Sequence, residues 1–422
     1  MTSEGDSSRD DQSPRSSFIR IAGAGTTFQA GSAAIDSATI MSALVLQLTG
    51  SVIAVGAVPA ILRFGWLFPQ FFVGYFASRS ASSMRYYVVG AFGRAAVIAA
   101  LAVVLAIGAT WPALFLSVAV LGLWTLYAFV SGIVAVPYND IVARAIPSDL
   151  RSRLLATRFL GGGILALFVA AAANSLIEQI SFPQSFAAVF ALSAALMIVS
   201  SAIFVSIPEP VRPVAGRKSD QSFGQYFTKG INTYRSHATF RRFVHAQWCG
   251  GVVLMAMPFY VVQANQSGLN LDRIALLLGA QALGALLSNP LWGWWGDRIG
   301  KRSLMRAVTT GRMVPPALVL LTSIGGFEFG LLPVYAVVFF VLGALSNGLT
   351  IAVIGLLMEI SPNDQRPAYA GYFNALTAPA FLLPFVGGFI VQFSGIVVVF
   401  GLSIVFAIAQ TVLIGKLRTH QL

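Results

Sequence analysis

From about residue 25 onward, the chain alternates long apolar runs with short polar breaks. Each run is long enough for the roughly 20 residues that an α-helix needs to cross a bilayer. Twelve such runs can be counted, so the pattern predicts an all-α polytopic membrane protein with twelve membrane-spanning helices. The runs begin near Phe28, Ile53, Tyr86, Pro112, Leu154, Pro183, Phe240, Arg273, Leu304, Leu331, Ala368 and Ile396.

One polar break is much longer than the others and divides the runs six and six. The sequence therefore predicts an N-terminal tail over 1–20, a six-helix bundle over 21–206, a central loop over 207–239, a second six-helix bundle over 240–417 and a C-terminal tail over 418–422. The aromatic and aliphatic residues of the loop have the spacing of a short helix in the membrane interface. They are Phe223, Tyr226, Phe227, Ile231 and Tyr234. A plain tether with a few aromatic residues is the alternative interpretation.

The Lys and Arg residues predict the orientation in the membrane. They are concentrated in the breaks on the side of the chain termini, whereas the opposite breaks contain only Arg273. Cytoplasmic loops of membrane proteins carry such an excess of basic residues. We therefore expect a protein of a bacterial-type inner membrane with both termini, and the loop over 207–239, in the cytoplasm.

The composition narrows the functional classes. Hydrophobic residues make up 57% of the chain and charged residues 10%, against about 25% charged in soluble proteins. The net charge of +12 follows from the basic loops, so no nucleic-acid partner is expected. The single cysteine, Cys249, provides neither a disulfide nor a metal-ligand spacing. The sequence also lacks a phosphate-binding loop and a catalytic grouping, so we expect no cofactor, no metal site and no enzyme activity.

An internal repeat relates the two halves of the chain. Residues 74–79 read Gly-Tyr-Phe-Ala-Ser-Arg, and 219 positions later residues 293–298 read Gly-Trp-Trp-Gly-Asp-Arg. Residues 147–151 and 362–366 match in a similar way at an offset of 215. Because each half has an even number of runs, the halves are expected to cross the membrane in the same direction. Parallel repeats of this kind place a transport site between the halves, near the midplane.

The loop over 293–302, with the sequence Gly-Trp-Trp-Gly-Asp-Arg-Ile-Gly-Lys-Arg, resembles the characteristic loop of the major facilitator superfamily. The resemblance extends over about residues 20–417 in span number, division into halves and motif position. It implies two pseudo-symmetric six-helix bundles that work by alternating access. Physically, we expect Gly293 to let two helices approach closely, Gly300 to permit a tight turn, and Lys301 and Arg302 to keep the loop in the cytoplasm.

The resemblance also implies a cytoplasmic gate in which Asp297 and Arg298 take part. The first-half copy has Ser78 at the position of the aspartate, so a one-sided gate is expected. We expect Asp297 to pair with a basic residue at the start of the fifth span: Arg151, Arg153 or Arg158. In the alternative interpretation, Asp297 only caps its own loop.

Charged residues inside the spans are costly and need a partner or a purpose. Asp36 belongs to a polar stripe at helical spacing, formed by Gln29, Ser32, Asp36, Thr39 and Ser42, which predicts a face turned away from lipid. Arg63 lies at a similar depth in the second span. Three interpretations stay open: Asp36 couples transport to protons, Arg63 binds an anionic group of a substrate, or the pair is a structural bridge.

Further candidates come from the spans that line the cavity in the superfamily: the first, fourth, seventh and tenth. They are Trp124, Tyr127, Ser131, Gln247, Trp248, Asn347 and Thr350, with Tyr372 and Asn374 of the eleventh span. Arg94 and Arg312, at corresponding places in the two halves, are interpreted as structural. The sequence predicts a monomeric secondary transporter of a small polar or amphipathic organic solute, coupled to protons or another ion. A drug efflux pump and a membrane scaffold without transport are the alternatives.

Overall fold

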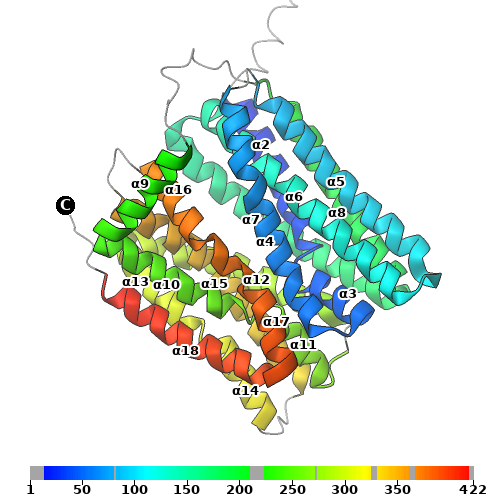
Figure 1. Cartoon of the computed structure of the whole chain (residues 1–422). Helices are drawn as coiled ribbons and strands as arrows, with labels where there is room; N and C mark the ends of the chain where they lie inside the picture. Colours follow the sequence, from blue (N-terminus) through cyan, green and yellow to red (C-terminus); the bar gives the residue numbers. More distant parts are fainter. Residues whose placement is uncertain are drawn as a thin grey trace, which may run out of the picture. The chain divides into compact units, whose positions relative to one another are not determined.

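The computed structural model describes residues 14–79, 82–209, 223–270, 273–324, 330–361 and 366–417 of the chain. These residues are almost entirely helical (Figure 1). No strand occurs in the described ranges. The predicted all-α class is therefore confirmed. Of the predicted tails and central loop, residues 1–13, 210–222 and 418–422 lie outside the described ranges.

The helices follow the apolar runs in order. The first six runs form α2 (Pro14–Ala33), α3 (Ile40–Thr49), α4 (Val52–Arg79), α5 (Met84–Ile107), α6 (Ala113–Ala145), α7 (Ser148–Gln179) and α8 (Gln184–Val205). Helix α9 (Phe223–Ser236) precedes the last six runs, which form α10 (Ala238–Leu254), α11 (Phe259–Gln266), α12 (Ile274–Arg298), α13 (Lys301–Gly311), α14 (Val314–Ile324), α15 (Leu331–Ile360), α16 (Arg366–Thr377), α17 (Leu383–Ser394) and α18 (Ile396–Gly415).

Ten stretches of the described chain are long and apolar enough to cross a membrane. The other two predicted runs, the first and the ninth, are each divided into two shorter helices, α2 with α3 and α13 with α14. The helix of the first run, α2, begins at Pro14, before the predicted start of the first span near Phe28. The chain is a multi-pass membrane protein, and its twelve runs correspond one by one to helices or helix pairs.

By its contacts the chain forms two compact units. The first contains residues 1–44 and 61–216, and the second contains residues 45–60 and 217–422. Residues 45–60 therefore pack with the later part of the sequence. A Cβ at Gly388 would lie only 2.7 Å from the Cα of Ile53, so two backbones of the second unit are in direct contact there.

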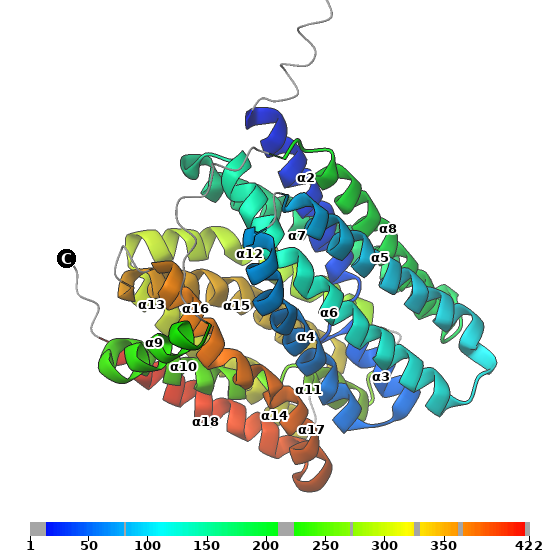
Figure 2. The ribbon, with the colours of Figure 1, turned by 45° about the horizontal axis from the view of Figure 1, so that its top comes forward.

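In the first unit, α2 packs against α7 and α8, and α5 packs against α6 and α8 (Figures 1 and 2). Small residues permit close packing between α2 and α7: a Cβ at Gly161 would lie 2.8 Å from the Thr26 hydroxyl. Aromatic rings fill one end of this unit. The rings of Tyr87 and Phe204 stack with their centroids 4.1 Å apart.

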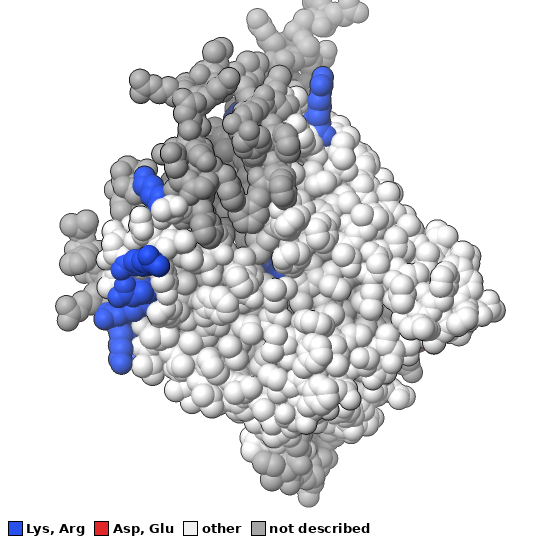
Figure 3. Space-filling view, in the orientation of Figure 1, with Lys and Arg blue, Asp and Glu red and all other residues white. Residues whose placement is uncertain are grey.

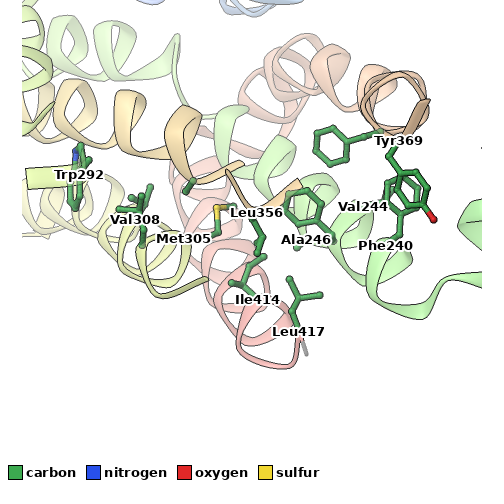
Figure 4. Close-up of a cluster of buried hydrophobic side chains, with 14 of the residues drawn as sticks. Phe240, Val244, Ala246, Trp292, Met305, Val308, Leu356, Tyr369, Ile414 and Leu417 are labelled. Carbon is green, nitrogen blue, oxygen red and sulfur yellow. The ribbon is translucent and has the colours of Figure 1, made fainter. Parts of the chain in front are cut away.

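In the second unit, α12 and α15 make the closest helix contact. A Cβ at Gly284 would overlap the carbonyl oxygen of Phe340, and one at Gly343 would overlap that of Gln281. A buried apolar cluster, which includes Phe240, Trp292, Met305, Leu356 and Ile414, joins α10, α12, α13, α15 and α18 (Figure 4). Between membrane helices, such contacts are stabilised mainly by van der Waals packing.

Helix α9 packs against α10 and α16 of the second unit. The Tyr234 hydroxyl lies 2.7 Å from His245 Nε2, and a Cβ at Gly230 would lie 2.6 Å from the Tyr372 ring. A helix thus exists where a short interfacial helix was predicted, and Tyr234 contacts protein. Its location in the membrane interface stays a prediction. The side chains of Phe223, Tyr226 and Phe227 lie outside the described residues. Described basic side chains gather near α9 on the face shown in Figure 3, which is otherwise largely uncharged.

Candidate functional site

A cavity of about 530 Å³ lies inside the first unit. Helices α2, α4, α5, α6, α7 and α8, together with the break between α2 and α3, contribute side chains to its wall. Its volume is in the range of small-molecule sites. The wall combines charged and polar residues with aromatic rings: Phe28, Asp36, Arg63, Trp66, Tyr87, Arg94, Trp124, Tyr127, Ser131, Tyr138, Arg158 and Phe204.

Asp36 lies in the break between α2 and α3 and holds the turn that precedes α3. Its Oδ1 accepts hydrogen bonds of 3.0 Å from the backbone N–H groups of Ala38 and Thr39 and one of 2.9 Å from the Thr39 hydroxyl. Aspartate side chains commonly form such bonds with the backbone two and three residues later. The predicted stripe on one continuous helix was therefore wrong, because residues 34–39 are not helical.

Arg63 of α4 lines the same cavity as Asp36, and the two opposite charges attract each other. The sequence-based prediction that these two residues share a site therefore agrees with their placement. Arg63 keeps an exposed surface, whereas Asp36 is half-buried. The cavity wall thus carries one guanidinium and one carboxylate at this place. Proton coupling by Asp36 and substrate binding by Arg63 stay predictions.

Arg94 of α5 is the residue that sequence analysis missed. Its side chain is 5% exposed and lines the cavity, with the guanidinium carbon 3.9 Å from the centre of the Phe28 ring. Its Nε makes no hydrogen bond within the described residues. The signal was available, since a charged residue inside a span indicates a functional site by the same argument that singled out Arg63.

Arg158 of α7 also lines the cavity. One of its terminal nitrogens donates a 2.5 Å hydrogen bond to the Tyr138 hydroxyl, and its guanidinium carbon lies 5.1 Å from the centre of the Tyr138 ring. A Cβ at Gly25 of α2 would overlap Nε of Arg158. Because Gly25 has no side chain, the Arg158 side chain can pass along its backbone into the cavity. Sequence analysis assigned Arg158 to the gate instead.

The three predicted residues of the fourth span lie together on the wall. Trp124 and Tyr127 stack with ring centroids 5.2 Å apart and an interplanar angle of 25°. Ser131 follows one turn later and is buried. The rigid aromatic pair provides an apolar surface, and the hydroxyl groups of Tyr127 and Ser131 add polar atoms to it.

Two candidates of the first span do not line this cavity. Gln29 faces α7, where a Cβ at Gly162 would lie 2.6 Å from Gln29 Oε1. Thr39 is fully buried and its hydroxyl donates to Asp36. Neither residue faces the cavity: Gln29 packs against Gly162 of α7, and Thr39 orients the Asp36 carboxylate.

The candidates in the second unit are not among the residues that line this cavity, and they make contacts within their own unit. The Trp248 indole donates to the Leu376 carbonyl at 3.0 Å, and the Asn347 amide donates to Asn289 at 3.0 Å. Thr350 donates to the carbonyl one turn earlier, and Tyr372 is buried in the apolar cluster. Asn374 is exposed and Gln247 is half-buried. A site that these residues form between the two halves stays a prediction.

The loop that carries the family resemblance is organised within the second unit. Asp297, whose side chain is 78% exposed, pairs with Lys301 at 2.7 Å, one turn away. Arg302 donates to the Ile414 carbonyl at 3.3 Å and also to that of Gly415, at the end of α18. Gly300 has a φ of +106°, which confirms the tight turn. A Cβ at Gly293 would meet nothing within 4 Å, so the close approach predicted there was wrong and occurs instead at Gly284 and Gly343.

The predicted pairing of Asp297 with an arginine of α7 would join the two units and stays a prediction. Arg153 and Arg298 are exposed, and the Arg151 side chain lies outside the described residues. The Asp297–Lys301 pair is the contact expected in the alternative interpretation, in which the aspartate caps its own loop.

A second charged cluster, not predicted, lies at one end of the first unit. Glu209 accepts hydrogen bonds from the Ser82 hydroxyl at 2.6 Å, the Ser83 N–H at 2.7 Å and Arg144 at 3.1 Å. Arg144 also pairs with Asp140 at 2.7 Å. Partial burial alone would raise the pKa of Glu209, but these hydrogen bonds together outweigh it and hold that pKa below its usual value. The cluster ties the α4–α5 connection to α6 and to the end of α8.

Comparison with known proteins gives similarities in sequence and in fold. A sequence model described as Major Facilitator Superfamily matches residues 255–420. Among solved structures, a D-xylose-proton symporter superposes with a TM-score of 0.71 at 15% sequence identity, covering 96% of this chain and 98% of that chain. The later part of the chain is thus similar in sequence to the major facilitator superfamily, and the fold of nearly the whole chain is similar to that of a solved transporter. A variant of the nucleoside transporter NupG superposes with a TM-score of 0.68 at 14% identity, over 95% of this chain and 98% of that one.

Curated relatives match only part of the chain. The Quinolone resistance protein NorA of Staphylococcus aureus is 29% identical over 148 residues, which is 34% of this chain and 35% of that protein. The chain thus spans about a third of the length of these relatives. An uncharacterized protein of Mycobacterium bovis is 24% identical over 304 residues, 69% of this chain and 56% of that protein. The fold is therefore similar to that of these solved transporters over nearly the whole chain, whereas the relatives leave the substrate open.

Proposed function

We propose that the protein is a secondary active transporter that carries a small polar or amphipathic organic solute across the membrane by alternating access. The observation that carries this proposal is the cavity of about 530 Å³ within a bundle of membrane helices, lined by four charged side chains. Charged groups at this depth are costly, and a polar solute that must leave water needs such partners. The family, and the symporter and nucleoside transporter that share the fold, favour transport over an enzymatic role.

Asp36 is the proposed proton-coupling residue. It is the carboxylate that faces the cavity, and Arg63 lies within its electrostatic reach. Protonation of Asp36 would release Arg63 from this attraction, so that proton binding and solute binding would compete or cooperate through one pair of residues. The fixed hydrogen bonds to Oδ1 would hold the carboxyl group in place while it exchanges its proton.

We also propose that the protein lies in the inner membrane as a monomer. The distribution of Lys and Arg supports an inner-membrane protein with both termini in the cytoplasm. The loop from Gly293 to Arg302 would form the cytoplasmic gate of a monomeric carrier. The protein would bind the solute and a proton or other coupling ion, and the lipid bilayer would surround it.

The test uses the purified full-length protein in detergent and in vesicles. Thermal stability is measured at two pH values against a panel of metabolites and antimicrobials, with Asp36→Asn beside the wild type. A ligand at a hundredfold its Kd adds about 2.7 kcal/mol to stability. We expect one chemical class to stabilise the protein, solute flux in vesicles to follow a pH gradient, and Asp36→Asn to abolish that dependence. Flux that ignores the gradient would contradict proton coupling, and a panel without any ligand or flux would contradict transport.

Drug efflux is the second candidate, and one observation favours it. The relative that matches over 148 residues is a quinolone resistance protein. If this protein exports drugs, cells that produce it should tolerate more quinolone than cells that produce an empty-vector control. A scaffold without transport is the remaining alternative, and it should tolerate Asp36→Asn and Arg63→Ala without loss.

A further inference from the structure

We propose that the cavity of the first unit recognises a small organic dianion, such as an aromatic dicarboxylate or phosphate monoester. This inference rests on the proposed function and names the substrate class of the same site. Within the described residues, Arg63, Arg94 and Arg158 line the cavity, against the single carboxylate of Asp36. The wall therefore carries a formal charge of +2.

The carboxylate of Asp36 leaves two of the three arginines without a counter-charge. Its attraction is directed to Arg63. In the described part of the chain, no ion pair is formed by Arg94 or Arg158. A buried charge without a counter-ion is strongly unfavourable. A ligand that carries two negative groups would remove this cost.

The donor atoms of both arginines are only partly used. Nε of Arg94 and Nε of Arg158 are buried and make no hydrogen bond within the described residues. Arg94 is 95% buried and contacts the Phe28 ring, while Arg158 donates to Tyr138. A guanidinium group has five N–H donors in a planar fork that fits carboxylate and phosphate oxygens. Because the Nε atoms are buried, the terminal N–H groups of the two forks are the donors that would bind an oxyanion in the cavity.

Arg312, the corresponding arginine of the second unit, has the contacts expected of a structural residue. Arg312 donates to the Gln410 side chain at 3.1 Å and to the Gly250 carbonyl at 3.2 Å. The pocket beside it holds only about 60 Å³. Arg312 thus has neutral oxygen acceptors and little free space, whereas Arg94 has an aromatic ring and an open cavity. The difference supports a ligand role for Arg94.

The aromatic residues of the cavity wall indicate what the uncharged part of the ligand is. Phe28 and Trp66 provide aromatic surface to the cavity, and the buried, stacked pair of Trp124 and Tyr127 forms part of its wall. Flat or apolar ligand groups pack well on such rings. The volume of about 530 Å³ accommodates one small ring with its acidic substituents, so the expected ligand combines two anionic groups with an apolar body.

The test measures the affinity of the purified full-length protein for five probes of similar size by calorimetry. Phthalate and phenyl phosphate are dianions, benzoate is a monoanion, benzamide is neutral and benzylamine is a cation. We expect a dianion to bind at least tenfold more tightly than benzoate, with no binding of benzamide or benzylamine. The order of phthalate and phenyl phosphate distinguishes a carboxylate from a phosphate ligand. Equal or tighter binding of benzamide or benzylamine would overturn the proposal.

Arginine variants show whether this cavity is responsible. Arg94→Gln and Arg158→Gln should each weaken dianion binding at least tenfold, and Arg94→Lys should recover only part of it because lysine lacks the fork. Arg85→Gln, an exposed arginine on the same helix as Arg94, is the matched control and should bind as the wild type does. Unchanged binding in folded Arg94→Gln and Arg158→Gln proteins would overturn the proposal.

Flux measurements separate this inference from the proposed function. If vesicles take up a neutral solute that neither dianion competes with, the inference fails and the transporter proposal stands. If dianions bind through Arg94 and Arg158 but no flux of any probe or solute occurs, the binding site stands and the transporter proposal fails.

Discussion

Arg158 of α7 lies across the backbone of Gly25 in α2, where any Cβ would overlap its Nε. The glycine therefore fixes the direction in which the guanidinium enters the cavity. We expect Gly25→Ala to displace Arg158 and to weaken dianion binding about tenfold, or about 1.4 kcal/mol, while the protein stays folded. Gly23→Ala on the same helix, where a Cβ meets nothing within 4 Å, is the control. Equal affinities for the two variants would show that Gly25 does not position Arg158.

Asp36 has a structural role in holding the turn before α3, which can be separated from its charge. We expect Asp36→Ala to lower stability by about 1 kcal/mol, the usual net contribution of an intramolecular hydrogen bond. Asp36→Asn keeps an oxygen acceptor and should remain close to the wild type in thermal stability. The comparison of the two melting temperatures in detergent checks this. If Asn destabilises as much as Ala, the charge rather than the oxygen acceptor holds the break between α2 and α3.

The contact between α12 and α15 depends on glycine at position 343. A methyl group there would overlap the Gln281 carbonyl oxygen, so Gly343→Ala should cost about 1–3 kcal/mol, the usual range for overpacking. Gly293→Ala provides the matched comparison in stability, because its Cβ would meet no atom within 4 Å and alanine favours the helix. Thermal unfolding in detergent measures both. A larger loss in Gly293→Ala would contradict the packing described for these helices.

Glu209 should make stability depend on pH in the acidic range. Because the folded state holds its pKa below the usual value of about 4.5, its ion pair and hydrogen bonds stabilise the protein above that pH. The contribution is lost as the pH falls through the folded pKa. We expect the difference in melting temperature between the wild type and Glu209→Gln to be largest near neutral pH and to shrink below about pH 4.5.

The exposed Glu178 of α7 provides the control for this pH series. Glu178→Gln should follow the wild type at every pH. A gap between the wild type and Glu209→Gln that stays constant down to pH 3.5 would show that the carboxylate charge of Glu209 is not the stabilising group.

The helices were predictable because apolar runs of bilayer length leave few alternatives. The breaks inside them were not. The period of Gln29, Ser32, Asp36 and Thr39 suits a continuous helix, yet Asp36 forms hydrogen bonds with the backbone two and three residues later and ends that helix. Side chains of Asp compete with the helix in this way, and the sequence alone does not show which hydrogen bond wins.

The candidate site was predictable in part for a related reason. Asp36, Arg63, Trp124, Tyr127 and Ser131 were selected because polar or aromatic residues inside a span need a common surface, and all five line one cavity. Arg94 and Arg158 were assigned elsewhere, because their sequence positions relative to glycines and loops suggested structure and gating. Which way a long arginine side chain points depends on its neighbours in space, here Phe28 and Gly25, and those neighbours come from a different helix.

The assignment of residues 45–60 to the second unit bears on dissection of the protein into fragments. A cut in the connection after α8 yields two polypeptides, but the first carries away the segment whose backbone packs on Gly388. Each fragment would then expose a glycine-lined helix surface that the other normally covers. Co-expression of both fragments, rather than either one alone, is the arrangement in which the native contacts of Ile53 can form again.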